Sequence, residues 1–399
     1  MYNLLSSFYY KDKSKYNELY ERRINNECAY KLPVFINDNQ AFFLITSEVC
    51  SKIENIYTLN MKLENNFNFD LPQIAIEKYI KKNLIEEIML TNDIEGIYST
   101  KKEIKEALTE TTSSNKQRRF IGLVKKYEKL ITKSEILLNN CDNIRSLYDE
   151  IVSNEIDEKD SPDGKIFRKS EVSVYSPTDK EKHRGIYPES KLIDFMRKSL
   201  EILHDDKIPY LIRICLFHYL FGYAHPFYDG NGRVSRFISS YLLNDKLNIL
   251  LSLRLSYTIK NNKSSYYNAF NVCNDKKNKG DLTPFILMFL DIIEKSELNL
   301  IENIQDGVDK LKFYHTAIGK IDLTDTQKDI LFILTQNTLF GDEGMSINEL
   351  VKACDKGNTK IREDIKQLQN NGIPIIAVKS GKKLLYTLDL DGIESLIKD

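Results

Sequence analysis

The sequence predicts a mainly α-helical protein with one short β-hairpin and a small α+β module at its C-terminal end. The 399 residues include only 16 glycines and 9 prolines, too few turn-forming residues for a many-stranded sandwich or barrel. Apolar residues recur at helical spacing along much of the chain. Outside the C-terminal end, the only convincing strand signal lies at 171–175. Together these observations favour a helical bundle.

The composition indicates a folded protein of roughly two or three domains, at about 150 residues per domain. Apolar residues make up 42% of the chain, which excludes a mainly disordered protein. The 57 Lys and Arg residues are balanced by 58 Asp and Glu residues, which excludes a globally basic nucleic-acid coat but not a local basic patch. The six cysteines form no CxxC pair, and no signal peptide or membrane span is evident, so we expect a cytoplasmic protein without a membrane partner.

Three parts are predicted along the chain. Residues 1–74 mix short apolar runs with Asn-rich segments, and the sequence assigns them no role. Residues 75–305 carry the clearest helical periodicity and form the predicted core. Residues 306–399 follow a different pattern and form the predicted C-terminal module.

The core is expected to begin with a helix that starts near 71. Ile80, Leu84 and Ile88 recur every four residues, and Gly96 is placed to end this helix with a left-handed cap. Further helices are expected after a capping box at 100–103 and at 120–139, 144–152, 190–204 and 209–223. The last of these is apolar on nearly all sides, which is typical of a helix at the centre of a bundle.

The strand signal at 171–175 is followed by turn-forming residues at 176–179 and by a second short extended piece at 185–187. This order predicts a β-hairpin between the core helices.

The central helix leads into the segment HPFYDGNGRVSR at 225–236. Pro226 disfavours helix at His225, so the chain is expected to turn there. Residues 230–232 can adopt positive φ values that aim successive backbone N–H groups into one concavity. A new helix then begins, and the positive end of its dipole attracts anions. The segment therefore predicts an anion site.

The side chains around this turn add the means for chemistry on a polyphosphate. Arg233 and Arg236 lie three residues apart and can both reach one polyphosphate. A carboxylate at Asp229 is reasonable beside an anion if Mg²⁺ joins the two. His225, at the edge of the turn, can take a proton from an attacking hydroxyl. Each residue alone has an ordinary structural explanation, but their conjunction within twelve residues has few.

This segment resembles the signature HxFx(D/E)GNGRxxR of the Fic family, and every specified position is met. The resemblance extends over about 75–305. It implies a Fic-type helical bundle with a hairpin flap. It also implies transfer of a nucleoside monophosphate, usually AMP from ATP with Mg²⁺, to a Tyr, Thr or Ser hydroxyl of a protein, including this protein itself. Many relatives pair through their surfaces, so a homodimer is a further expectation.

The resemblance also implies a role for each residue of the signature. His225 would deprotonate the target hydroxyl, and Asp229 would hold Mg²⁺. The remaining residues would hold ATP or support the loop: Gly230, Asn231 and Gly232 at the α- and β-phosphates, Arg233 and Arg236 at the outer phosphates, and Phe227 by packing against the core.

A second segment, TNDIEG at 91–96, resembles the inhibitory motif (S/T)xxxE(G/N) found in many Fic proteins. Continuing the apolar stripe of the helix at about 80–96 places Thr91 and Glu95 on its inward face. A buried carboxylate needs a cation, whereas a Glu that bends to solvent or forms an ordinary ion pair is the alternative. The resemblance implies that Glu95 pairs with Arg236 and removes it from the γ-phosphate, while Thr91 holds the helix in place.

Two other features are less specific. The segment 164–174 resembles the flap that docks a target segment by strand addition, which assigns this role to Val172, Ser173 and Val174, with an ordinary strand edge as the alternative. Tyr267 is the second residue of a tyrosine pair that resembles the pair enclosing the adenine, although at least one of the two is expected to pack in the core.

The C-terminal module resembles a winged helix. Its expected elements are helices at 326–335, 346–354 and 358–370, followed by strands at 375–378 and 384–388. Within it, 359–384 carries six basic and two acidic residues, a balance that suits contact with a nucleic-acid backbone. Docking of a protein or dimerisation is the alternative.

Three functions remain open at this stage. The first is a self-inhibited protein adenylyltransferase. The second keeps the same site but removes AMP, or uses another donor such as UTP or a phosphocholine carrier. The third is a DNA-binding regulator with a nucleotide as ligand, against which the intact His225 argues because sensing a ligand requires no base.

Overall fold

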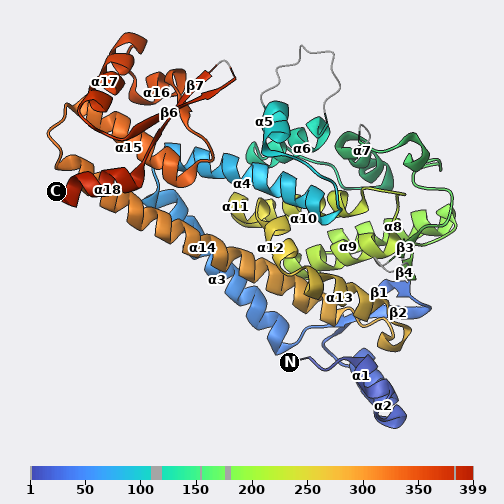
Figure 1. The fold of residues 1–399 in the computed structure, drawn as a ribbon. Coiled ribbons are helices and arrows are strands. Elements are labelled where there is room, and N and C mark those ends of the chain that lie inside the picture. Colours follow the sequence, from blue (N-terminus) through green and yellow to red (C-terminus); the bar gives the residue numbers. More distant parts are fainter. Residues whose placement is uncertain (1, 109–118, 153–154, 176–180, 382, 399) are drawn as a thin grey trace. The chain divides into compact units, whose positions relative to one another are not determined.

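The computed structural model describes residues 2–108, 119–152, 155–175, 181–381 and 383–398. The chain is mostly helical with small antiparallel sheets, which confirms the predicted fold class (Figure 1). The turn expected at 176–179 and Lys382 of the basic segment lie outside the described residues. Within the part of the chain that is described, no helix has the length and hydropathy needed to cross a membrane.

The chain forms two compact units. They consist of Met1–Asn60 with Ile85–Glu297, and of Met61–Leu84 with Leu298–Asp399. Three helices contribute to both units: α3 (Ser47–Asp70), α4 (Gln73–Ile94) and α14 (Thr283–Gly319). The borders expected after residues 74 and 305 therefore lie inside α4 and α14.

The first unit is built around α9 (Tyr210–Ala224), which is buried along nearly its whole length, as expected for an all-round apolar helix. It packs against α8 (Glu189–His204) and α10 (Asn231–Lys246) (Figure 1). The other helices of this unit are α1 (Leu5–Tyr9), α2 (Lys13–Ile24), α5 (Lys101–Leu108), α6 (Ile121–Ile131), α7 (Cys141–Val152), α11 (Ile249–Ser252), α12 (Leu255–Asn261), α13 (Lys263–Asn274) and the short 3₁₀ turns η1 (Glu158–Asp160) and η2 (Lys276–Asn278).

Helix α5 begins at the predicted capping box. The Thr100 hydroxyl accepts from the Glu103 backbone N–H at 3.2 Å, and the Glu103 carboxylate accepts from the Thr100 N–H at 2.8 Å.

The N-terminal region contains a β-hairpin that the sequence analysis missed. Strand β1 (Ala29–Ile36) pairs antiparallel with β2 (Asn39–Leu44). The turn residues Asn37 and Asp38 have φ values of 47° and 66°, the left-handed pair that matches the twist of a two-residue hairpin. The expectation that 171–175 was the only strand signal outside the C-terminal end was therefore wrong.

The sequence did not predict β1 because Pro33 lies inside it, and proline within a segment normally argues against a strand. The pairing register shifts between Lys31 and Phe35, so the proline sits where the ladder is already irregular. On its other side β2 hydrogen-bonds to the distant residues Gly280 and Leu282, a pairing that only the tertiary fold creates.

The expected hairpin in the core is present, but its second strand comes earlier than predicted. Strand β3 (Ser173–Tyr175) pairs antiparallel with β4 (Glu181–Arg184) rather than with 185–187. Gly185 still donates its N–H to Val172 O at 2.9 Å, so the two arms of the hairpin stay joined beyond the strands.

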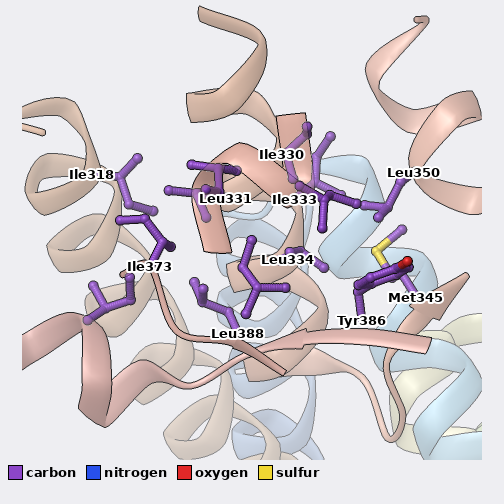
Figure 2. Close-up of a cluster of buried hydrophobic side chains, with 14 of the residues drawn as sticks. Ile318, Ile330, Leu331, Ile333, Leu334, Met345, Leu350, Ile373, Tyr386 and Leu388 are labelled. Atoms are coloured by element: carbon purple, nitrogen blue, oxygen red, sulfur yellow. The ribbon is translucent and has the colours of Figure 1, made fainter. Parts of the chain in front are cut away.

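The second unit contains the three helices and two strands expected at its C-terminal end. Its elements are α15 (Asp325–Phe340), β5 (Met345–Ser346), α16 (Ile347–Cys354), α17 (Asn358–Asn370), β6 (Ile375–Ser380), β7 (Lys383–Leu388) and α18 (Leu390–Lys398). The three strands form an antiparallel sheet in the order β5-β7-β6. Buried apolar side chains from these elements, such as Leu331, Leu334 and Leu388, pack into one cluster (Figure 2).

Candidate active site

The loop between α9 and α10 has left-handed residues at His225 and Gly230, two positions where the sequence predicts a turn. His225 has φ 49° and donates its backbone N–H to Phe221 O at 3.0 Å, which ends α9. Gly230 has φ 77° and precedes the first residue of α10. The expectation that Asn231 and Gly232 also adopt positive φ was wrong, because both belong to the first turn of α10. The anion site predicted for this loop therefore corresponds to the N-terminus of α10, whose first N–H groups lack intrahelical partners.

The side chain of Asn231 braces the loop. Its amide oxygen accepts from the Phe227 N–H at 3.0 Å and its amide nitrogen donates to Phe227 O at 2.8 Å. The Phe227 ring is fully buried, stacked on Tyr148 with centroids 3.6 Å apart and packed edge-on against Phe167. Since both polar atoms of the Asn231 amide hydrogen-bond to Phe227, this side chain serves to hold the turn.

The segment 91–96, which the sequence analysis predicts to be inhibitory, contacts the second arginine of the signature. Arg236 is 1% exposed and donates from Nε to Thr91 Oγ1 at 2.8 Å. One terminal nitrogen donates to Thr91 O at 2.9 Å and forms an ion pair with Glu95 at 2.8 Å. Gly96 has φ 75° at the end of the segment, as its position after α4 predicted.

Glu95 also lies close to the N-terminus of α10. A Cβ atom built on Gly232 would come within 2.0 Å of Glu95 Oε1. Gly232 is thus the residue that allows the carboxylate to approach the first turn of the helix, where a phosphate would bind.

A buried carboxylate that the sequence analysis did not single out lies two turns before Glu95 on the same helix. Glu87 accepts from the Ser256 N–H at 2.8 Å, from the Ser256 hydroxyl at 2.6 Å and from the Tyr127 hydroxyl at 3.3 Å. Burial raises the pKa of Glu87 to about 7. Its position three residues after Leu84 on the inward stripe was the available signal.

His225 is half-buried, and burial lowers the pKa of its imidazole to about 4, with further lowering by His183 and Arg168. A lowered pKa keeps the ring neutral near pH 7, which is the form that accepts a proton.

Arg168 holds the backbone of His225 and both arms of the hairpin. Its guanidinium is 1% exposed and donates to His225 O at 2.8 Å, to Ser170 O at 2.6 Å and to Ile186 O at 2.9 Å. Because these acceptors are three separate backbone carbonyls, no sequence pattern reveals the arrangement. The sequence analysis placed Arg168 only as part of the flap-like segment.

The hairpin is tied to the last turn of α9 next to His225. Ile186 donates its N–H to Ala224 O at 3.1 Å, and a ring nitrogen of His183 lies 2.6 Å from Tyr223 O. Val172 and Ser173 are half-buried at the start of this hairpin. Val174 lies in β3 with its backbone described, whereas its side chain lies outside the described part of the structure.

Asp229 and Arg233 are the remaining charged residues of the signature. One Asp229 oxygen accepts from the Gly230 N–H at 2.6 Å, and the side chain is 50% exposed. Arg233 is fully buried and forms an ion pair with Glu155 at 2.6 Å, a partner that the sequence analysis did not predict.

One exposed carboxylate beside a helix N-terminus suits Mg²⁺. Among the described residues, no group of three or more His, Cys, Asp or Glu side chains forms a dedicated metal cage. Mg²⁺ usually takes one or two carboxylates together with water and substrate phosphates, so Asp229 fits a magnesium ion that arrives with a nucleotide.

The tyrosine pair separates into a core residue and a surface residue. Tyr266 is 3% exposed, and its hydroxyl lies 2.6 Å from a ring nitrogen of the buried His218. Tyr267 is 41% exposed, and its pKa is raised by burial and by the neighbouring Glu95. Its ring is thus available near the contact between Glu95 and Arg236.

Residues 138–243 match the model of the Fic/DOC family, and the loop at 225–236 lies within this range. A solved structure of a Fic family protein from Desulfovibrio desulfuricans G20 is similar at 18% identity with a TM-score of 0.54, covering 90% of this chain and 98% of that chain. Two further solved structures match with TM-scores below 0.5. Fic-1 from C. elegans has 18% identity and a TM-score of 0.45, covering 64% of this chain and 74% of that chain. A Fic domain containing signaling protein from Bacteroides thetaiotaomicron VPI-5482 has 20% identity and a TM-score of 0.44, covering 63% of this chain and 97% of that chain.

Proposed function

The chain contains a Fic domain at residues 138–243, and from this premise we propose that it is a self-inhibited protein adenylyltransferase. It would transfer AMP from ATP to a Tyr, Thr or Ser hydroxyl of a protein, itself included. Fic domains generally transfer AMP or other nucleotide groups to proteins. What we propose beyond this is that ATP is the donor, that a protein hydroxyl is the acceptor and that the segment 91–96 inhibits the reaction. The observation that carries it is one loop that holds a neutral His225, the exposed Asp229 and the N-terminus of α10 together.

The transfer requires a base, a leaving group and stabilisation of charge. His225 takes the proton from the target hydroxyl, the hydroxyl oxygen bonds to the α-phosphorus, and the bond from that phosphorus to the β-phosphate oxygen breaks. Pyrophosphate leaves with the bonding electrons. The N–H groups at the start of α10 and the Arg233 guanidinium stabilise the negative charge on the phosphates. Asp229 would hold Mg²⁺, which when bound neutralises part of that charge.

The restraint on this reaction is the contact of Thr91 and Glu95 with Arg236. While Arg236 donates to Thr91 and pairs with Glu95, its Nε and one terminal nitrogen are turned away from the outer phosphate of ATP. The Glu95 carboxylate at the first turn of α10 adds repulsion against a phosphate in the same place. The wild-type protein should therefore show weak basal transfer.

Intact mass of the purified protein after incubation with ATP and Mg²⁺ tests both parts of the proposal. Wild type, Glu95→Gly and Glu95→Gly with His225→Ala are compared side by side. Gain of AMP units in Glu95→Gly, at a level well above wild type and absent from the double variant, is the expected result. Parallel incubations with GTP, CTP, UTP and a phosphocholine carrier identify another donor, and a mass gain with one of those alone would contradict ATP as the donor.

AMP removal is the runner-up chemistry of the same site. It is tested by incubating the protein with a target that already carries AMP. Loss of the AMP mass in the wild type, with no gain in any variant, would favour removal over transfer.

A second candidate function, DNA binding, concerns the C-terminal module. Arg362 and Lys366 on α17 and Lys379 and Lys383 on the β6–β7 strands are exposed, whereas Lys360 is paired with the buried Asp364 at 2.9 Å. Exposed basic side chains on a helix and an adjoining strand pair suit a phosphate backbone. A DNA affinity that falls steeply with salt, and whose slope decreases in Lys379→Glu, would support it. Salt-independent binding would favour protein docking.

A further inference from the structure

Arg233 and Glu155 form a buried ion pair in which both side chains are nearly inaccessible. The Arg233 side chain is 1% exposed and that of Glu155 5%, and the nitrogen and oxygen lie 2.6 Å apart. Burial raises the pKa of Glu155, and the neighbouring Arg233 opposes this rise by favouring the charged carboxylate. This pair joins the segment after α7 to the first turn of α10, across 78 positions in the sequence.

The guanidinium of Arg233 has donors left over. Nε and the second terminal nitrogen are buried and have no hydrogen-bond partner among the described residues. Asp229 lies 3.8 Å from that second nitrogen, beyond hydrogen-bonding distance. Buried cationic donors without an acceptor are costly, which points to an anion as their acceptor.

A second donor without an acceptor lies in the same place. The Tyr148 hydroxyl is buried and has no hydrogen-bond partner in the described chain, and its ring stacks on Phe227 in the signature loop. Arg233 and Asp229 both act electrostatically on this hydroxyl. A Cβ atom built on Gly230, the residue before α10, would lie 3.4 Å from the Tyr148 ring, so Tyr148 and Arg233 both lie beside the N-terminus of α10.

The two arginines of the signature differ in how they are held. Arg236 donates from Nε and from a terminal nitrogen to the inhibitory segment, so two of its three nitrogens are held there. Arg233 is held through a single terminal nitrogen, and its other two nitrogens have no hydrogen-bond partner among the described residues. A carboxylate that accepts a hydrogen bond from one end of the guanidinium restricts the orientation of the group and leaves its other donors without a partner.

We propose that Glu155 is a positioning residue, which holds Arg233 by one nitrogen so that its remaining N–H groups face the phosphates of ATP. This inference rests on the proposed function, since it assumes that the signature loop binds a nucleoside triphosphate. Glu155 acts through Arg233 and does not itself touch the nucleotide. Its charge also compensates the buried guanidinium before the nucleotide arrives.

Glu155 is itself fixed in place. The backbone N–H of Phe120, the residue before α6, hydrogen-bonds to its carboxylate, and Arg119 adds an attractive charge. A carboxylate held by a backbone N–H at the start of a helix is a firm anchor for a side chain that must keep one orientation.

The opposite role would give the opposite result. If Glu155 were a second inhibitory carboxylate, competing with phosphate for Arg233, neutralising it would strengthen nucleotide binding. If it positions Arg233, neutralising it weakens binding. The sign of the change therefore decides between the two.

The test measures the affinity of a non-hydrolysable ATP analogue with Mg²⁺ by calorimetry, on the full chain carrying Glu95→Gly. In this background, Glu155→Gln should weaken binding by about tenfold or more, because one charge-assisted contact orients the whole fork. Glu150→Gln is the matched control. Glu150 pairs with Lys126 between α7 and α6, and its loss should leave the affinity unchanged.

A double-mutant cycle separates positioning from a general loss of structure. Arg233→Gln with Glu155→Gln replaces the ion pair by two neutral amides, and this protein should bind the analogue no more weakly than Arg233→Gln alone. Additive losses, or unchanged or tighter binding in Glu155→Gln, would overturn the positioning role. A Glu95→Gly protein that binds the analogue but transfers nothing would refute the proposed function and leave this inference standing. One that binds no analogue at all would refute both.

Discussion

The region around the signature loop and the central cluster of the second unit differ in the kind of side chain that they bury. Around the signature loop, charged side chains are buried, among them Arg168, Arg233, Arg236 and Glu87. In the C-terminal unit, the central cluster consists of Ile, Leu, Met and Tyr side chains contributed by helices and strands together (Figure 2).

This difference has consequences for what each region can do. A buried charge needs a specific partner. Removing that partner strongly destabilises the local structure, because an uncompensated charge then stays buried. We therefore expect the signature loop to respond to the loss of one carboxylate, such as Glu95. Hydrophobic packing is non-directional and depends on volume, so the C-terminal cluster resists change but offers no comparable switch.

The largest expected effect belongs to the apolar cluster. Leu334→Ala removes a fully buried side chain and should lower the free energy of unfolding by about 2–5 kcal/mol, because a cavity remains. Nucleotide affinity at the signature loop should not change. Urea unfolding followed by calorimetry with the ATP analogue measures both. Leu396→Ala, at an exposed position of α18, is the control. A loss of nucleotide binding in Leu334→Ala would show that the two regions are not energetically distinct.

The second prediction concerns Arg168, which organises the signature region without a carboxylate partner in the hydrogen bonds described for it. Arg168→Lys keeps the charge but cannot reach three carbonyls at once, so the transfer rate of the Glu95→Gly protein should fall by about 10²-fold through misplacement of His225. Affinity for the ATP analogue should stay the same.

Amide hydrogen exchange at 181–187 should rise in the same variant, because the hairpin loses a tether. Arg145→Lys is the matched control, since Arg145 donates to Ile166 O and does not contact His225. Equal losses in both lysine variants would argue that Arg168 has no specific link to the base.

The third prediction concerns the partner of Arg236. Thr91→Val removes the hydroxyl that accepts from Nε but keeps the backbone acceptor and Glu95, so basal transfer should rise by about tenfold, less than in Glu95→Gly. Automodification rates with ATP and Mg²⁺ measure the difference. Asp93→Asn breaks the exposed ion pair with Lys260 near the same end of α4 and should have no effect. A rise in Asp93→Asn of the same size would indicate that any loosening of this helix end releases the enzyme.

The smallest expected effect is the pH dependence. The pKa of His225 is lowered to about 4, so the base stays neutral and the transfer rate should be nearly constant from pH 8 to pH 5. Activity is lost only as the pH falls through the lowered pKa. A base with the ordinary pKa near 6.5 would lose about three-quarters of its activity at pH 6. Initial transfer rates of the Glu95→Gly protein across this pH range measure the pKa of the base. A midpoint of the rate profile near pH 6.5 would contradict a pKa lowered by burial.

The local features of the signature loop could be predicted from the sequence, since neighbouring residues determine them. Pro226 favours a turn at His225, Gly230 supplies a left-handed residue, and the apolar stripe of α4 turns Thr91 inward. Glu95 was also expected on the inward face, but it lies one residue beyond α4 and is exposed, although it still pairs with Arg236. Periodicity likewise located the helices of the C-terminal unit. Two predictions failed where a residue type allows more than one conformation. Gly232 was expected to have a positive φ but is helical, and Pro33 argued against the strand β1 that contains it.

What only the tertiary structure decided are the contacts between segments far apart in the chain. Arg168 donates to the carbonyls of His225, Ser170 and Ile186. Arg233 forms an ion pair with Glu155, and β2 hydrogen-bonds to the backbone at Gly280. No short-range pattern encodes these pairs, because a charge or a carbonyl accepts many partners and the choice depends on which elements pack together. The sequence by itself determined where the loop turns and which charged residues it carries, because neighbouring residues set local conformation. The packing determined that Arg236 contacts the segment 91–96 and that Arg233 pairs with Glu155, because those partners come from distant parts of the chain.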